Sequence, residues 1–155
     1  MPKVDLDAIP ENNATGYPAP FDQPVQGRWK RRIGPVFGMT HLGASHTVLK
    51  PGAWSSQRHW HDDEDELLVM LTGEAVLIED GGRTILRPGD ICAWPSGIEN
   101  GHHVTNESEA DCSFLAISGG NKDGTGGYSD IDMRFTADGY VHRDGTPYPT
   151  KRIKA

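Results

Sequence analysis

Short runs of strand-forming residues, separated by turn residues, constrain this chain more than any other feature. The runs recur roughly every 8–12 residues between Val36 and Ser118, which is the spacing of an all-β sandwich or barrel. The longest run, Glu66–Asp80, is apolar enough for a helix, but the Asp-Gly-Gly sequence that begins at Asp80 favours a hairpin instead. The sequence therefore predicts an all-β domain.

The two ends of the chain lack this pattern. Five prolines among the first 24 residues exclude a long helix and would interrupt strand ladders. A Gly-rich stretch at 119–127 leads into a tail without a clear period. We therefore expect one domain over residues 1–155, with an irregular arm at 1–24, a barrel core at 36–118 and a loop and extended tail at 119–155. The arm and the tail would cover either their own barrel or a partner chain.

Composition excludes several classes of partner. The chain has 15 Lys and Arg against 22 Asp and Glu, a net charge of -7. Nucleic acids and anionic membranes require a basic face, so neither is expected as a partner. No apolar stretch approaches the ~18 residues of a membrane span or resembles a signal peptide. Two cysteines, Cys92 and Cys112, make no disulfide framework, and we expect a cytoplasmic protein with reduced thiols.

The residues that carry chemistry lie between Gly52 and Gly73. His59 and His61 are separated by one residue, and alternate residues of a strand share a face, so both imidazoles should point the same way. Glu66 follows after four residues and adds a carboxylate. A His-X-His pair alone is weak evidence, because an exposed strand edge can carry one. Two imidazoles and a carboxylate together make half of a divalent-metal site.

A second stretch, at the next hairpin, supplies a third imidazole. Gly89 is followed after five residues by Pro95, and His102 precedes Asn106 with three residues between them. With His102 the set contains three histidines and one carboxylate. Four protein ligands would leave one or two positions for water or substrate, and such openness is typical of catalytic rather than structural sites.

Two positions in this set have an alternative. Asp65 is the runner-up to Glu66, because five acidic residues lie together at 62–66. His103 is the runner-up to His102, but it should point to the other face of its strand. Imidazole and carboxylate suit Fe, Mn, Zn, Ni or Co, and no thiolate lies in either stretch. We therefore expect one divalent metal ion, and not a structural zinc site of the cysteine type.

These two stretches resemble the paired motifs of the cupin superfamily, G(X)5HXH(X)3–4E(X)6G and G(X)5PXG(X)2H(X)3N. The sequence departs from them by one extra residue before His59 and by two extra residues between Gly97 and His102. The resemblance covers roughly residues 49–118 and extends to small single-domain bacterial cupins that carry the label of sugar-phosphate isomerase. It implies a cupin-type jelly-roll β-barrel and one divalent metal ion, with the ligands His59, His61, Glu66 and His102.

Strand parity has a consequence for assembly. If Glu66 points into the barrel, three apolar residues of the same run point outward: Leu67, Val69 and Leu71. A strand that is apolar on both faces needs a second covering layer, which the arm, the tail or another subunit would supply. We expect a homodimer, the commonest oligomer.

The fold does not specify the reaction, and three hypotheses follow. The first is a metalloenzyme of isomerase or lyase type that acts on a small oxygenated molecule such as a sugar or sugar phosphate. The metal would bind adjacent hydroxyl and carbonyl oxygens and lower their pKa, with Glu99 or His103 as the candidate catalytic base. The second is an Fe(II)-dependent dioxygenase. The third is a non-catalytic module that binds or senses a small molecule.

Overall fold

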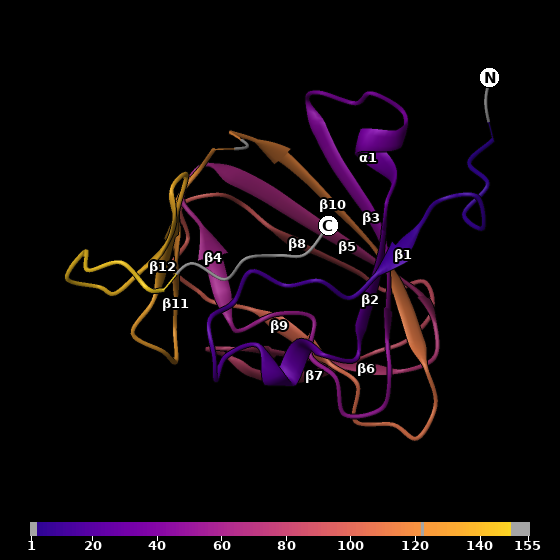
Figure 1. The fold of residues 1–155 in the computed structure, drawn as a ribbon. Helices are drawn as coiled ribbons and strands as arrows, with labels where there is room; N and C mark the ends of the chain where they lie inside the picture. The colour runs from indigo at the N-terminus through magenta and orange to yellow at the C-terminus, as the bar shows by residue number, and fades with distance from the viewer. Residues whose placement is uncertain (1–2, 122, 150–155) are drawn as a thin grey trace.

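The computed structural model describes residues 3–121 and 123–149, and strands dominate this part of the chain (Figure 1). Its helical segments are two short ones, η1 and α1. No helix among these residues is long and apolar enough to cross a membrane. In chain order the elements are β1 (Glu11–Asn12), η1 (Gln23–Val25), β2 (Arg28–Arg32), α1 (Ile33–Val36), β3 (Leu42–Leu49), β4 (His59–His61), β5 (Glu64–Thr72), β6 (Ala75–Glu79), β7 (Gly82–Leu86), β8 (Ile91–Trp94), β9 (His103–Thr105), β10 (Cys112–Gly120), β11 (Gly126–Tyr128), β12 (Arg134–Thr136) and β13 (Gly139–Val141).

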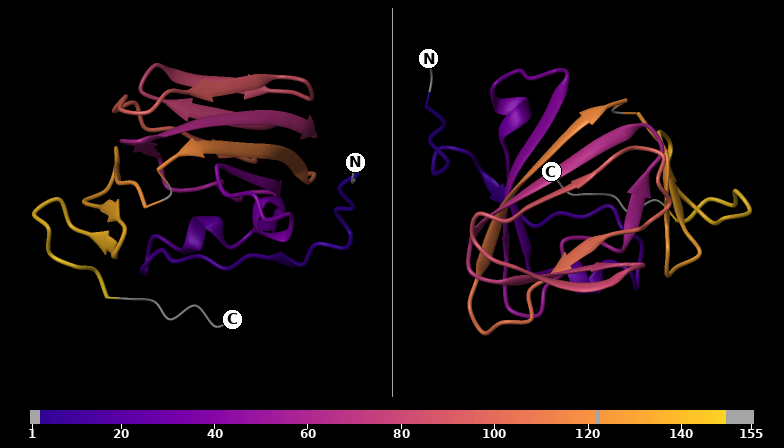
Figure 2. Two further views of the ribbon diagram at one scale, coloured as in Figure 1. Left: turned by 90° about the horizontal axis from the view of Figure 1, so that it is seen from above. Right: turned by 180° about the vertical axis from the view of Figure 1, so that it is seen from behind.

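The largest sheet has the strand order β1-β2-β3-β10-β5-β8, and all its pairs are antiparallel. A four-stranded sheet, β13-β12-β11-β4, and a three-stranded sheet, β7-β6-β9, face it around a common interior (Figures 1 and 2). Isolated bridges pair Trp54 with Thr105 and His59 with His102, which ties the segment around β4 to β9. The predicted all-β jelly roll is confirmed. Within the described residues its ladders form three sheets rather than one continuous cylinder.

The expected hairpin around residues 80–82 is confirmed, since β6 and β7 pair across it. The apolar run before it is not one strand, however. It divides at Gly73 into β5 and β6, which belong to different sheets. Gly73 has a φ of 71°, and a Cβ there would lie 2.7 Å from the carbonyl oxygen of Asp111. Only glycine fits this conformation and this close approach, and so the chain can turn from one sheet to the next.

Part of the N-terminal arm and part of the C-terminal tail pack on their own barrel. The ring of Tyr17, in the N-terminal arm, stacks on that of Tyr140 in β13 with centroids 5.3 Å apart. Tyr17 and Val25 belong to a buried cluster with Tyr128 and Met133. The arm also contributes β1 to the large sheet, and β2 likewise precedes residue 36, where the strands were expected to begin. The covering layer at this end is therefore the chain's own arm and tail.

Candidate metal centre

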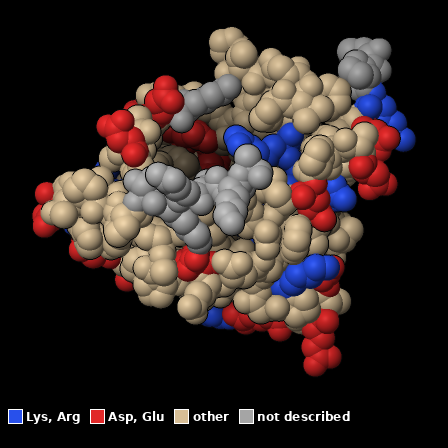
Figure 3. Space-filling model, in the orientation of Figure 1, with Lys and Arg blue, Asp and Glu red and all other residues tan. Residues whose placement is uncertain are grey.

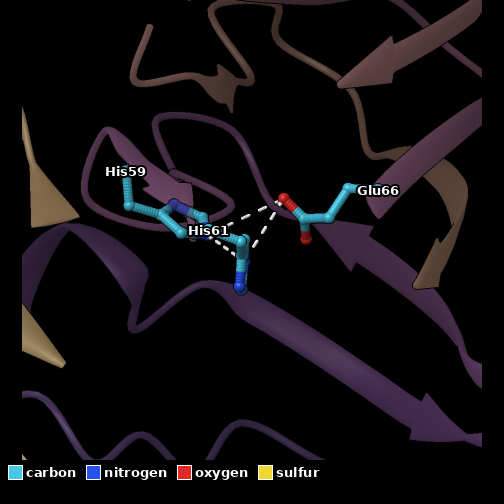
Figure 4. A group of neighbouring side chains, drawn as sticks. All are labelled: His59, His61 and Glu66. Carbon is cyan, nitrogen blue, oxygen red and sulfur yellow. Dashed lines mark hydrogen bonds and ion pairs between the residues drawn. The ribbon is translucent and has the colours of Figure 1, made fainter. Parts of the chain in front are cut away.

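His59 and His61 lie on one face of β4, and Glu66 points toward them from β5 (Figure 4). The Nε2 atoms of the two histidines are 3.2 Å apart. The Oε2 atom of Glu66 lies 3.4 Å from Nε2 of His61 and 3.9 Å from Nε2 of His59. Residues from two sheets thus bring three donor atoms to one point, as the parity of the His-X-His pair predicted.

His102 approaches Glu66 from the segment just before β9. Its Nε2 atom is 2.8 Å from Oε2 of Glu66. Its position is fixed by two backbone hydrogen bonds with His59 and by the ring of Trp94, which stacks on the imidazole at a centroid distance of 3.9 Å. We call these four side chains, His59, His61, Glu66 and His102, the His–Glu cluster.

His103 points elsewhere, as alternation along a strand requires. It is buried, and its Nδ1 atom lies 2.9 Å from the carbonyl oxygen of Ser56, to which it donates a hydrogen bond. Its ring packs edge-on against Trp54. Of the two neighbouring histidines, His102 is the one that the structure brings to Glu66.

Residues of the second motif hold this loop against β4. Gly97 has a φ of 77°, and its N–H donates to the carbonyl oxygen of His61 at 2.8 Å. Asn106 is fully buried, and its side-chain amide donates to the carbonyl oxygens of Leu49 and Ala110. The motif glycine and asparagine therefore position the loop, while the histidine between them supplies the donor atom.

The Nδ1 atoms of His59 and His102 differ in their hydrogen-bond partners. Nδ1 of His59 lies 3.0 Å from the carbonyl oxygen of Gln57 and 3.2 Å from Oγ of Ser56. A carbonyl can only accept, so Nδ1 of His59 carries the proton and Nε2 presents a lone pair, the arrangement that second-layer contacts impose on metal-binding histidines. Nδ1 of His102 is buried and has no hydrogen-bond partner within the described residues.

Burial and mutual contact set the charge states of the cluster. Burial lowers the pKa of His59 to about 4, so this imidazole is neutral at neutral pH. Burial raises the pKa of Glu66, but the hydrogen bonds from His102 and His61 outweigh it and hold that pKa well below its usual value. A neutral imidazole and an ionised carboxylate are the forms that bind a metal ion.

The neighbouring acids are separated by their side-chain directions. Asp65, the runner-up, is exposed and accepts a hydrogen bond from the backbone N–H of Ser96. Asp62 pairs with Arg134 at 2.8 Å. Glu64 and Glu66, which share one face of β5, line the interior. The structure therefore places Glu66, and not Asp65, among the histidines.

The donor separations fit a divalent ion. Imidazole and carboxylate donors at about 2.1 Å from an ion lie about 3.0–3.4 Å from one another in octahedral or tetrahedral geometry. The separations among His59, His61 and Glu66 run from 3.2 to 3.9 Å, close to that range, and these three donor atoms form a compact group; His102 joins it through Glu66, at 2.8 Å. The donor set also has the imidazole and carboxylate chemistry of Mn, Fe, Co, Ni and Zn sites.

The cluster opens into a cavity of about 770 Å³ that is partly open to solvent. Tyr17, Tyr128 and Tyr140 line it, and the hydroxyl of Tyr128 lies 3.3 Å from that of Tyr17. Glu99, a candidate base, is exposed and borders a separate depression beside Arg58. The structure does not bring Glu99 to the cluster, because its loop turns outward before His102.

Sequence reasoning missed two groups that line this cavity. The three tyrosines lie far apart in the chain, and no local pattern announces their convergence. The other group is basic: Arg28, Lys30 and Arg32 on β2. Their alternation was a usable signal, but a charged segment beside a proline-rich arm was not expected to be an inner strand.

The comparisons with known proteins agree with this geometry. The family model of the cupin domain matches residues 45–118. A crystal structure from Silicibacter pomeroyi, named as a sugar phosphate isomerase from a cupin superfamily, is 35% identical, with a TM-score of 0.89 over 99% of this chain and 100% of that chain. This chain belongs to the cupin superfamily.

Two further relatives of this cupin are less similar over its length. A structure from Acidithiobacillus ferrooxidans, provisionally named a sugar phosphate isomerase, is 20% identical and has a TM-score of 0.70, over 80% of this chain and 81% of that chain; it supports the fold alone. The oxalate-binding protein of Thermotoga maritima is 35% identical over 69 residues, which are 44% of this chain and 54% of that protein. The match thus spans about half the length of this curated relative.

Proposed function

We propose that this cupin is a metal-dependent enzyme whose His–Glu cluster holds one divalent ion, and that it isomerises or cleaves a small oxygenated molecule such as a sugar or sugar phosphate. The observation that carries the proposal is the convergence of three imidazole nitrogens on one carboxylate oxygen at the wall of a large cavity. The name of the Silicibacter pomeroyi relative supports the same substrate class.

The ion would act as a Lewis acid that polarises neighbouring hydroxyl and carbonyl oxygens and lowers their pKa. The chain's own residues would position the substrate and move its proton. Burial raises the pKa of Tyr128 well above its usual value, so its phenol stays protonated at neutral pH. The Tyr128 ring lies 5.9 Å from that of His59, and its hydroxyl donates to that of Tyr17, so the two phenols would offer hydrogen-bonding groups near the cluster.

Removal of a proton next to a carbonyl requires a base within the cavity. Glu64 is better placed than Glu99, because it shares the inward face of β5 with Glu66 and lines the cavity. His103 also lines it and is held in one tautomer by Ser56. We therefore propose Glu64 as the first candidate for the general base and keep His103 as the second.

Hydrogen exchange in deuterated water tests this function. Metal-loaded protein would be incubated with aldoses and ketoses, free and phosphorylated, because an enediol route replaces the C–H next to the carbonyl with C–D. We expect exchange with at least one sugar, visible as loss of that proton's NMR signal. The exchange should be abolished in His61→Ala, slowed in Glu64→Gln and unchanged in Asp63→Asn, a matched change of an exposed neighbour.

Three results would contradict the proposal. If neither hydrogen exchange nor turnover were seen with any sugar, isomerase activity would be excluded. Oxygen uptake that needs Fe(II) and fails with Zn(II) would assign the chain to the dioxygenases. A ligand that raises the melting temperature but is recovered unchanged from a metal-free protein would make it a binding module.

We also propose a homodimer, which the outer face of the large sheet supports. Leu71 on β5 is 41% exposed and Ile91 on β8 is 65% exposed, and the two strands are neighbours. Neither the arm nor the tail covers this face in the described residues, since both pack at the other end. Sedimentation equilibrium of the wild type and of Leu71→Ser/Ile91→Ser tests this. A wild-type monomer at micromolar concentration would exclude the dimer.

A further inference from the structure

β2 brings three positive charges to the cavity: Arg28 is buried, Lys30 is half-buried and Arg32 is exposed. Its alternate residues Arg28, Lys30 and Arg32 all line the cavity, and we call them the basic row. The residues between them point outward: Arg31 lies 3.3 Å from Glu11 of the neighbouring β1. Figure 3 shows lysine and arginine atoms on one side of the hollow in the molecule and aspartate and glutamate atoms on the other side. The basic row and Arg31 thus lie on opposite faces of β2, and the two faces differ in their acidic neighbours.

Within the described residues, no carboxylate lies within 4.0 Å of any member of the basic row, whereas Arg31 has two acidic partners. Arg28 is only 8% exposed. One of its terminal nitrogens donates to the carbonyl oxygen of Ser55, but its Nε atom is buried without a hydrogen-bond partner. A buried cation is unfavourable unless an anion or further hydrogen bonds compensate it. An anion in the cavity would supply both a counter-charge and hydrogen-bond acceptors for Arg28.

The neighbouring strand adds hydroxyl groups to the same wall. In the register of β2 with β3, Lys30 lies opposite Thr47 and Arg32 opposite Ser45. Both hydroxyl residues line the cavity. Burial and the two flanking arginines also lower the pKa of Lys30 to about 8, as expected for an ammonium held among like charges. The wall therefore combines guanidinium, ammonium and hydroxyl donors, the groups that bind phosphate oxygens.

We propose that the basic row binds a doubly charged anionic group of the phosphate monoester class, carried by the molecule whose oxygens face the His–Glu cluster. In the large sheet, β2 lies three strands from β5, or roughly 14 Å along the curved sheet at ~4.8 Å per strand. The two walls can therefore hold the two ends of one small molecule. The nature of the reacting end rests on the proposed function, but the presence of the anion site does not.

A phosphate monoester fits the basic row better than a carboxylate does. A monocarboxylate brings one negative charge and two acceptor atoms, which would leave two of the three cations without a counter-charge. A phosphate monoester brings nearly two charges and three strong acceptor oxygens. Arginine also pairs with phosphate through parallel hydrogen bonds, and Arg28 has an unused Nε–H.

Anion titration of EDTA-treated protein by calorimetry tests this site without any metal. The probes are sulfate and inorganic phosphate, with malonate and acetate as carboxylate probes. We expect saturable binding of both tetrahedral anions to the wild type and at least tenfold weaker binding to Lys30→Met/Arg32→Met. These two positions are chosen because they are less buried than Arg28, so the variant should fold. Arg31→Met removes a positive charge from the other face of the same strand and should bind as the wild type does.

Absence of saturable binding, equal binding by the double variant, or an equal loss in Arg31→Met would overturn the site. Tighter binding of malonate than of phosphate would overturn the phosphate class. Metal content, measured on the same preparations, separates this inference from the proposed function. If the protein binds phosphate but no metal, the anion site is supported and the proposed metal-dependent function is contradicted. If it binds metal but no tetrahedral anion, the anion site is contradicted and the proposed function still stands.

Discussion

Two walls of one cavity, the His–Glu cluster and the basic row, are built on opposite principles. In the cluster every charge has a partner: Oε2 of Glu66 lies within 3.9 Å of three imidazole nitrogens. In the basic row no described carboxylate lies within ion-pair distance, and one guanidinium nitrogen is buried without a partner. The first wall is arranged to hold a cation and the second to hold an anion. A ligand that meets both must carry oxygen donors at one end and negative charge at the other.

The largest effect should come from removing one ligand of the cluster. His61→Ala takes away a donor atom and should weaken metal binding roughly a hundredfold or more. His103→Ala should leave metal binding nearly intact, because that ring faces Ser56 and Trp54. Metal content after dialysis against a defined free-metal buffer measures both. Full occupancy in the His61 variant would defeat the ligand assignment, while sulfate binding should persist in both variants if the walls are independent.

The cluster could be predicted because its geometry follows from short-range rules. Alternation along a strand places His59 and His61 on one face, and the same rule turns His103 away from His102. The choice of Glu66 over Asp65 followed from spacing to Gly73, whose left-handed backbone marks where β5 ends. Each of these inferences needs only neighbouring residues.

A second pair of variants tests that choice between acids. Glu66→Gln keeps the shape of the side chain but removes the one negative charge of the cluster, so metal affinity should fall at least about tenfold. Asp65→Asn changes an exposed carboxylate that accepts a hydrogen bond from Ser96, and it should leave the affinity unchanged. Competition against a metal-binding dye gives both constants. Equal losses in the two variants would mean that general negative charge, rather than a ligand position, governs binding.

The basic row and the tyrosines could not be predicted in the same way. Whether Arg28 faces solvent or a cavity depends on β2 joining the large sheet through β3, a contact across many residues of sequence. Tyr17 meets Tyr128 and Tyr140 only because the arm and the tail fold over one end of the barrel. The position of Glu99 depends on its loop in a similar way: the residue borders a separate depression although it is close to His102 in sequence.

The pH dependence of anion binding tests whether the charge of Lys30 contributes to the basic row. Because burial, Arg28 and Arg32 lower the pKa of Lys30 to about 8, this lysine is charged below that pH and loses its proton as pH rises through it. Sulfate keeps its two charges over this range, so its affinity should fall about tenfold between pH 7 and pH 10. Besides the basic row, the charged or titratable residues that line the cavity are Glu64, Glu66, Asp123, Asp138, His59, His61, His102, His103, Tyr17, Tyr128 and Tyr140.

A matched variant and a second observable check this assignment. In Lys30→Met the fall in sulfate affinity around pH 8 should disappear, and its persistence would assign it to another group. Without an anion, the free energy of unfolding of the wild type should rise between pH 8 and pH 10.5. In that window the unfolded chain binds the Lys30 proton and the folded chain does not. Urea unfolding at pH 7.5 and pH 9.5, compared with the variant, measures this contribution.

The smallest effect concerns how firmly the cluster is held. Oγ of Ser56 lies 3.2 Å from Nδ1 of His59, but the carbonyl oxygen of Gln57 also accepts from that atom at 3.0 Å. Ser56→Ala removes the first contact and keeps the second, so the tautomer of His59 should survive and metal affinity should fall only a few-fold, less than the roughly tenfold or more typical of a lost second-layer partner. Ser55→Ala is the control for loss of a neighbouring hydroxyl, since Oγ of Ser55 accepts from the N–H of Val104 and lies 3.4 Å from Oγ of Ser56 but has no hydrogen bond to the imidazole. A hundredfold loss in Ser56→Ala would show that the hydroxyl, and not the backbone carbonyl, orients His59.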